Sequence, residues 1–218
     1  MIPPFNQSPA GGGPELSHAW LSEALELLRN DARAVRLHSN EFYKIVLAPQ
    51  SGYSRRIHVW SMDALQALHG NVHGHCWPFD SLVLSGALVE ETYSVSPGDE
   101  VDAYVYYASG TPMRRGGRVS LTKTSVTQFD VGDRYHRNGT ELHLAYPAAP
   151  HTVTALTHTL LRSDSAQVYV RDSRFGTSEN SRAVSHREVA ALTELLEDLQ
   201  QTARRLKTAG LGFKVKDR

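Results

Sequence analysis

The sequence predicts one domain built mainly of antiparallel β-strands that close into a barrel or sandwich, with a helix at each end. Short apolar or β-branched runs with a period of two fill the middle of the chain, and turn sequences such as Ser-Pro-Gly-Asp at 96–99 separate them. No helical pattern interrupts these runs, which argues against a parallel α/β sheet. The expected strands lie at about 42–48, 55–61, 81–93, 101–107, 119–127, 140–146, 151–161 and 167–171.

Amphipathic patterns predict a helix on either side of the strands. Ser17 resembles an N-cap, and apolar residues follow it at spacings of three and four. Ser185 and Glu188 form a capping box ahead of a second such pattern. These helices either pack on the outside of the barrel or build a dimer contact. The expected organisation of this single domain is a disordered tail (1–14), an N-terminal helical segment (15–40), a β-barrel (41–172) and a C-terminal helix (185–210).

The composition limits the kinds of partner. The 218 residues include 23 basic and 23 acidic side chains, so no net charge attracts the chain to nucleic acid or to an anionic membrane surface. No apolar run approaches the roughly 18 residues of a membrane span. The single cysteine, Cys76, has no internal disulfide partner. We therefore expect a cytoplasmic monomer or homodimer whose partners are small molecules.

The segment from Gly70 to Gly86 carries the clearest indication of chemistry. His73 and His75 are alternate residues, so on a strand both imidazoles face the same point. Neutral imidazole is a common protein ligand for first-row metals. Two histidines on a strand are also often only a polar face, and here the surroundings favour a metal site. Asp80 follows five positions after the second histidine, and a Val-Leu-Ser-Gly sequence ends the segment.

This segment resembles the first motif of the cupin superfamily, whose small β-barrels usually hold a metal ion on two histidines, a glutamate and a distant histidine. Residues 139–143 are similar to the second cupin motif, which carries the distant histidine. The resemblance covers nearly all of the expected strands. It implies a jelly-roll (double-stranded β-helix) barrel with His73, His75 and His143 as metal ligands. His151 is an alternative third ligand.

Within the cupins the chain looks most like the cysteine dioxygenase group of thiol dioxygenases, which hold iron with three histidines. Residues 86–93 are similar to a G-x-L-x-E-T segment of that group, and the Tyr-Ser-Arg sequence ending at Arg55 matches its Y-x-R element. His158 lies fifteen residues beyond His143, which is the interval of the group. The resemblance implies that Arg55, or its neighbour Arg56, binds a substrate carboxylate, and that His158 is an outer hydrogen-bonding group of the catalytic site.

Two departures from this group bear on the substrate. Leu160 stands where the group has a catalytic-site tyrosine. Arg55 also lies closer to the histidine pair than the group's pattern places its arginine. Cysteine itself is therefore not the expected substrate.

The role of Asp80 depends on the strand register. Counted forward from His75, Asp80 occupies the place of the cupin acidic ligand, but counted back from Gly86 that place falls on Phe79. A shift of one residue reverses the face on which a strand residue lies. In the second reading Phe79 lines the pocket and Asp80 points away. Three neutral imidazoles alone leave the charge of the ion uncompensated and several coordination positions open.

These observations lead to one main hypothesis of function and two alternatives. The main hypothesis is a non-haem Fe(II) oxygenase or dioxygenase that acts with O2 on a small carboxylate-bearing substrate, such as a thiol or an amino-acid-like molecule. The choice of iron follows from the resemblance. One alternative is a Zn, Ni or Mn cupin that acts as an isomerase, lyase or hydrolase. The other is a cupin that binds a small ligand without catalysis.

Overall fold

The computed structural model describes residues 14–38, 40–50, 53–60, 70–107, 114–159, 163–170, 182–209 and 216–217. The expected disordered tail lies outside these residues, apart from Pro14, the first residue of the first helix. The helical elements are α1 (Pro14–Asn30), a short 3-10 helix η2 (Ala32–Ala34) and α2 (His186–Thr208). The strands are β1 (Val35–Leu37), β2 (Phe42–Gln50), β3 (Tyr53–Trp60), β4 (Val72–His73), β5 (Phe79–Ser85), β6 (Ala87–Tyr107), β7 (Arg114–Asp130), β8 (Asp133–Arg137), β9 (Leu142–Pro147), β10 (Val153–Thr159), β11 (Ser165–Val170), β12 (Arg182–Ala183) and β13 (Lys216–Asp217).

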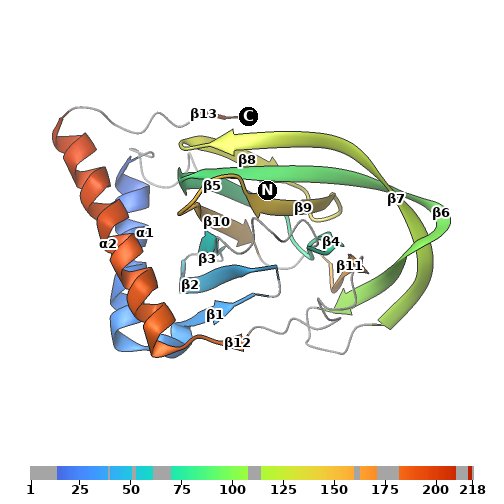
Figure 1. The fold of residues 1–218 in the computed structure, drawn as a ribbon, viewed down its shortest axis with the longest axis horizontal. Coiled ribbons are helices and arrows are strands. Elements are labelled where there is room, and N and C mark those ends of the chain that lie inside the picture. The colour runs from blue at the N-terminus through green and yellow to red at the C-terminus, as the bar shows by residue number, and fades with distance from the viewer. Residues whose placement is uncertain are drawn as a thin grey trace.

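The strands form two sheets, and their neighbours run antiparallel except for β13 beside β8. The first sheet has eight strands in the order β12-β1-β2-β3-β10-β5-β8-β13, and the second has five in the order β11-β4-β9-β6-β7. One half of the long β6 pairs with β9, and its other half pairs with β11. The second sheet therefore curves back on itself around the short β4 (Figure 1).

Side chains from both sheets fill the space between them. Aromatic rings dominate this cluster, which draws on β2, β3, β5, β6, β7, β8 and β10. Its buried members are Phe42, Trp60, Phe79, Val83, Leu88, Phe129, Tyr135 and Leu156. The predicted fold class is thereby confirmed: the protein is mainly antiparallel β, with two sheets packed face to face in a jelly-roll-like barrel and two flanking helices.

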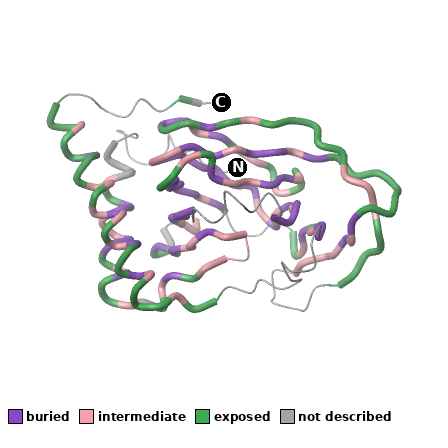
Figure 2. The backbone as a smooth tube through the Cα atoms, in the orientation of Figure 1, coloured by how far each residue is buried: buried purple, intermediate pink, exposed green. Residues whose placement is uncertain are grey.

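Both helices cover the outer face of the eight-stranded sheet (Figure 1). Leu21 of α1 and Leu196 of α2 belong to one apolar cluster with Ile45 and Ile57 of the sheet. Of the two arrangements left open by the sequence, the structure shows packing on the barrel. Figure 2 shows exposed residues along the outer sides of the helices and along the far part of the β6–β7 ribbon. Neither helix of the described chain has the length and apolar character needed to cross a bilayer.

Two expected boundaries are corrected in the strands. The run expected at 81–93 is two strands, because the chain passes from the first sheet to the second at Gly86. Gly86 has a φ of +70°, and a Cβ there would lie 2.4 Å from Thr152 Oγ1, so only glycine fits this crossing. The turn expected at 96–99 is instead part of β6. The pairing with β7 shifts between Pro97 and Val101, so this sequence forms a bulge and the strand continues.

The N-terminal helical segment is also shorter than expected. The helix ends at Asn30, and strand β1 occupies the later part of the 15–40 segment. Asp31 caps the intervening 3-10 helix by accepting a hydrogen bond from the backbone N–H of Arg33. Val35 is then fully buried and lies opposite Ile45 of β2. Three residues are too few for a period-two pattern to indicate a strand.

We expect Leu196→Ala to lower the free energy of unfolding by about 2–5 kcal/mol. Leu196 is fully buried between α2 and the sheet, so truncation removes apolar contacts and leaves a cavity. Leu195 is only partly buried at the same contact, and Leu195→Ala is the matched control with a smaller loss. Urea unfolding followed by circular dichroism measures both. Equal losses in the two variants would contradict the packing described for α2.

Candidate metal centre

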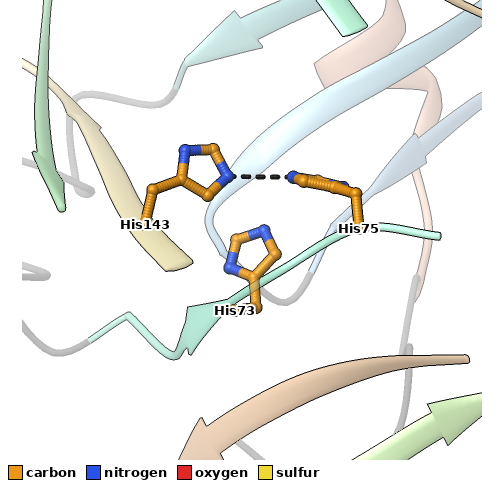
Figure 3. A group of neighbouring side chains, drawn as sticks. All are labelled: His73, His75 and His143. Carbon is orange, nitrogen blue, oxygen red and sulfur yellow. Dashed lines mark hydrogen bonds between the residues drawn. The ribbon is translucent and has the colours of Figure 1, made fainter. Parts of the chain in front are cut away.

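The three histidines expected as metal ligands lie together between β4 and β9. His73 ends β4 and is paired directly with His143 of β9. Opposite residues on neighbouring strands bring their side chains close together. His75 follows two residues along the chain and faces the same point (Figure 3). One ligand nitrogen from each histidine lies within 4.8 Å of the other two.

Backbone contacts hold the segment that carries His75. The His75 N–H donates to the carbonyl of Gly139 at 2.7 Å, and the Gly74 N–H donates to the carbonyl of Gln167 at 2.9 Å. A Cβ at Gly139 would lie 2.6 Å from the His75 carbonyl oxygen. Glycine at 139 therefore permits the close approach that places His75 beside His143.

Hydrogen bonds also orient two of the imidazole rings. Nδ1 of His73 lies 3.0 Å from the carbonyl oxygen of Asn71, which leaves Nε2 toward the centre of the cluster. Nδ1 of His143 lies 2.5 Å from Oε1 of Glu90. Nε2 of His143 faces Nε2 of His75 at 2.9 Å. The arrangement presents imidazole nitrogens to a common point and gives their rings fixed outer contacts.

Glu90 is a buried carboxylate that the sequence analysis missed. Arg137 donates to its Oε2 through Nε at 2.7 Å and through Nη2. Burial by itself raises the pKa of Glu90, but the hydrogen bonds from His143 and Arg137 outweigh it and hold this pKa below its usual value. The sequence signal that could have identified Glu90 is strand alternation, which places it on the same core face as the apolar Leu88. An acidic residue in that position requires a partner.

Burial keeps two of the clustered histidines neutral. It lowers the pKa of His73 to about 4, and the neighbouring His143 contributes to this shift. Burial also lowers the pKa of His75 well below 6.5, with His73 and His143 adding to the effect. Neutral imidazole is the form that binds metal ions. Three nitrogen donors suit a divalent first-row transition metal better than the oxygen-preferring Mg²⁺ or Ca²⁺.

The structure places Asp80 away from this cluster. Its Oδ1 lies 3.3 Å from Nδ1 of His136, the residue opposite it on β8. The ring centre of Phe79 instead lies 4.9 Å from the ring centre of His75 and 5.7 Å from that of His143. The register counted back from Gly86 therefore describes the structure. The alternative third ligand, His151, is exposed in a turn with a φ of +55° and lies outside the cluster.

We expect Asp80→Asn to keep its bound metal, with an affinity within about twofold of the unaltered protein. Asparagine is close to aspartate in size, and the position contacts His136 rather than a clustered histidine. Metal content after gel filtration, with folding checked by circular dichroism, measures this. A folded Asp80→Asn protein without metal would make Asp80 a ligand.

A cavity of about 110 Å³ lies against the histidine cluster. One water molecule needs roughly 10–15 Å³ by this measure, so the cavity is large enough for a small molecule. Two cationic residues, Lys44 and Arg56, contribute to its wall, and no carboxylate among the described residues does so. The described residues around it are His38, Asn40, Phe42, Lys44, Arg56, His58, Asn71, His73, Gly74, His75, Cys76, Trp77, Tyr106, Leu156, Ala166 and Val168.

Arg55, expected to bind a substrate carboxylate, is not among the residues around this cavity. Its guanidinium forms an ion pair with Glu23 of α1 at 2.9 Å and donates to the carbonyl of Ala48 at 2.8 Å. It also lies 5.4 Å from the ring centre of Trp20. Adjacent strand residues face opposite sides of the sheet, so Arg55 contacts the helix layer while Arg56 faces the cavity. Of the two arginines named from the sequence for a carboxylate contact, only Arg56 lines the cavity.

His158 lies one layer behind the cavity wall. Its ring stacks on Trp77 at 4.5 Å, and Trp77 in turn lines the cavity. Its Nδ1 lies 3.0 Å from the carbonyl oxygen of Thr159. Burial lowers the pKa of His158 to about 4, and the charge of Arg56 adds to the shift. Leu160, compared in the sequence with a tyrosine of the cysteine dioxygenase group, lies outside the described residues.

The fold and the cluster together define a β-barrel protein with a candidate three-histidine metal site. No protein-family model matches the chain, and no similar sequence was found among curated proteins.

Several solved structures are similar over part of the chain. One is an HTH_3 family transcriptional regulator from Vibrio cholerae, with 9% identity and a TM-score of 0.33 over 56% of this chain and 52% of that chain. The match therefore spans about half of the regulator. Another is a hydroquinone 1,2-dioxygenase in complex with Cd²⁺ and 4-hydroxybenzonitrile, with 11% identity and a TM-score of 0.36 over 66% of this chain and 74% of that chain.

A third is an L-ribose isomerase from Cellulomonas parahominis, with 15% identity and a TM-score of 0.39 over 78% of this chain and 97% of that chain. These three proteins differ in function. At such TM-scores the similarities carry no argument for the activity of this chain.

Proposed function

We propose that the protein is a cupin metalloenzyme, a non-haem Fe(II) oxygenase that acts with O2 on a small carboxylate-bearing substrate. The observation that carries this proposal is the convergence of His73, His75 and His143 beside a cavity that His73, His75 and Arg56 line. Three protein ligands leave coordination positions for substrate and oxygen. A bound Fe(II) ion would hold these two reactants side by side and activate them together.

The residues around the cavity supply binding and orientation. In this proposal Arg56 binds the carboxylate, because its planar guanidinium matches a carboxylate with two charge-assisted hydrogen bonds. The guanidinium carbon of Arg56 lies 5.3 Å from the ring centre of Trp77, which His158 supports from behind. Trp77 therefore fixes the arginine, and His158 fixes the tryptophan.

Aromatic side chains limit the water that reaches the proposed reaction site. The ring of Phe79 packs against His75 and His143, and Phe42 lines the cavity beside His58, whose ring it stacks on at 4.3 Å. A site with less water strengthens the ionic contacts made inside it. This setting favours a compact anionic substrate over a nucleic acid, for which the described cavity is too small.

Metal analysis and an oxygen-uptake assay test the proposal. The protein is purified without a histidine tag, its metal content is measured, and the metal-free form is reloaded separately with Fe(II), Zn(II), Ni(II) or Mn(II). We expect one metal per chain and oxygen consumption with a small organic acid only after loading with Fe(II). Turnover that is equal with Zn(II) and needs no oxygen would indicate an isomerase, lyase or hydrolase. Absence of metal binding would indicate a ligand-binding protein and end the proposal.

A further inference from the structure

We propose that Glu90 is a positioning residue that, held by Arg137, sets the tautomer of His143 and directs the Nε2 lone pair of His143 at the metal position. This inference rests on the proposed metal centre. It assigns a role to a carboxylate that is neither among the described residues around the cavity nor among the clustered ligands.

The contacts of Glu90 define its role. The side chain is fully buried, and each of its two oxygens has a different partner. Oε1 lies 2.5 Å from Nδ1 of His143, and Oε2 accepts two hydrogen bonds from Arg137. The Arg137 guanidinium also donates to the His136 carbonyl at 2.8 Å and lies 5.4 Å from the ring centre of Tyr135. Glu90 is thus held in one orientation.

This orientation determines which nitrogen of His143 carries the proton. An ionised carboxylate only accepts hydrogen bonds, so Nδ1 of His143 must donate to Glu90. A neutral imidazole that is protonated at Nδ1 has its lone pair on Nε2. In the structure this lone pair faces Nε2 of His75 at 2.9 Å, so in the metal-free protein His75 donates there and His143 accepts. Metal binding requires the His75 proton to move to Nδ1 of His75, whereas His143 already presents its lone pair. The same Nε2 lone pair is then available to a metal ion.

Arg137 determines how the amide in Glu90→Gln is oriented, so this substitution has a defined effect on the tautomer of His143. In Glu90→Gln the amide oxygen turns to Arg137, which only donates, and the amide NH2 turns to Nδ1 of His143. Nδ1 must then accept, so the His143 proton moves to Nε2 and blocks the metal-binding nitrogen. A carboxylate that orients a metal-bound histidine is typically worth about 10–100-fold in metal affinity.

The test compares Glu90→Gln with Glu91→Gln. Glu91 is the matched control because it is also buried on β6 but bonds to Lys123, Tyr93 and Tyr146 instead of a clustered histidine. With Co(II) as the probe metal, we expect Glu90→Gln to bind about 10–100-fold more weakly than the unaltered protein, with an altered visible spectrum. Glu91→Gln should bind within about twofold of it. Equal affinities in all three proteins would overturn the role of Glu90.

Two further measurements separate tautomer control from a general effect on folding. In Glu90→Gln/Arg137→Gln, the amide oxygen introduced at position 137 accepts a hydrogen bond from the amide NH2 introduced at position 90. The amide oxygen at position 90 can then face His143 again. Co(II) affinity should recover by about tenfold relative to Glu90→Gln, and no recovery would contradict the role of Arg137. Histidine ¹⁵N shifts of the unaltered metal-free protein should show His143 protonated at Nδ1. Protonation at Nε2 would overturn the inference without any variant.

These outcomes are distinct from failure of the proposed function. If the unaltered protein binds no Co(II), Zn(II) or Fe(II), the metal centre itself is wrong. If it binds metal and Glu90→Gln binds equally well, only the role of Glu90 is wrong.

Discussion

His143→Ala is expected to lose its bound metal while the barrel stays folded. His143 supplies one of three clustered nitrogens, and it is the member that the second sheet places opposite His73. Removing a ligand should weaken binding by more than the roughly 10–100-fold that loss of an outer partner costs. The fold should persist because the apolar clusters between the sheets and beneath the helices do not include the three histidines. Isothermal titration with Co(II) and thermal unfolding measure the two effects.

His151→Ala provides the matched control for this variant. His151 was the alternative third ligand, but it is exposed in a turn. Its replacement should leave Co(II) affinity within about twofold of the unaltered protein. His73→Ala and His75→Ala should behave like His143→Ala. Full metal occupancy in His143→Ala together with loss in His151→Ala would reverse the assignment of the third ligand.

Arg56→Lys is expected to raise KM by about 10–100-fold with unchanged metal content. Hydrogen bonds to a charged group contribute about 1.5–3 kcal/mol, and each 1.4 kcal/mol corresponds to about a tenfold change. A lysine ammonium keeps the charge but cannot reproduce the two parallel hydrogen bonds of a guanidinium. The measurement is steady-state oxygen consumption with a substrate found by the oxygen-uptake assay.

Arg55→Lys is the neighbouring control, because Arg55 has the same side chain on the opposite face of β3. Its contacts are with Glu23, Ala48 and Trp20 in the helix layer. The variant should therefore lower the melting temperature and leave KM unchanged. A raised KM in Arg55→Lys, with none in Arg56→Lys, would restore the assignment first made from the sequence.

The sequence was sufficient for the fold class and for the three clustered histidines. The period of two in the strands, the capping box at Ser185 and the single-residue spacing between His73 and His75 are local patterns. His143 was named from the resemblance to the second cupin motif, and the structure places it beside the other two histidines. The alternation rule also identified Phe79 as the residue that faces the cluster, once it was counted from Gly86. Such patterns are set by backbone geometry, which nearby residues largely determine.

The strand boundaries at 96–99 and 31–37 depended on contacts from distant parts of the chain. β6 continues through Pro97 because β7 pairs with it on both sides of the bulge. β1 forms because Val35 is buried against Ile45. A turn-forming sequence and a three-residue strand take their final structure from these pairings.

Only the tertiary structure determined which arginine lines the cavity and which glutamate contacts His143. Arg55 and Arg56 are adjacent and chemically identical, and the helix layer on one face of β3 determines which of them reaches the cavity. Glu90 and Glu91 form a similar pair, and β9 and β8 together bring His143 and Arg137 to the first of them. Sequence alternation separates the two faces of a strand. The elements packed on each face determine which of the two faces lies toward the cavity and the histidine cluster.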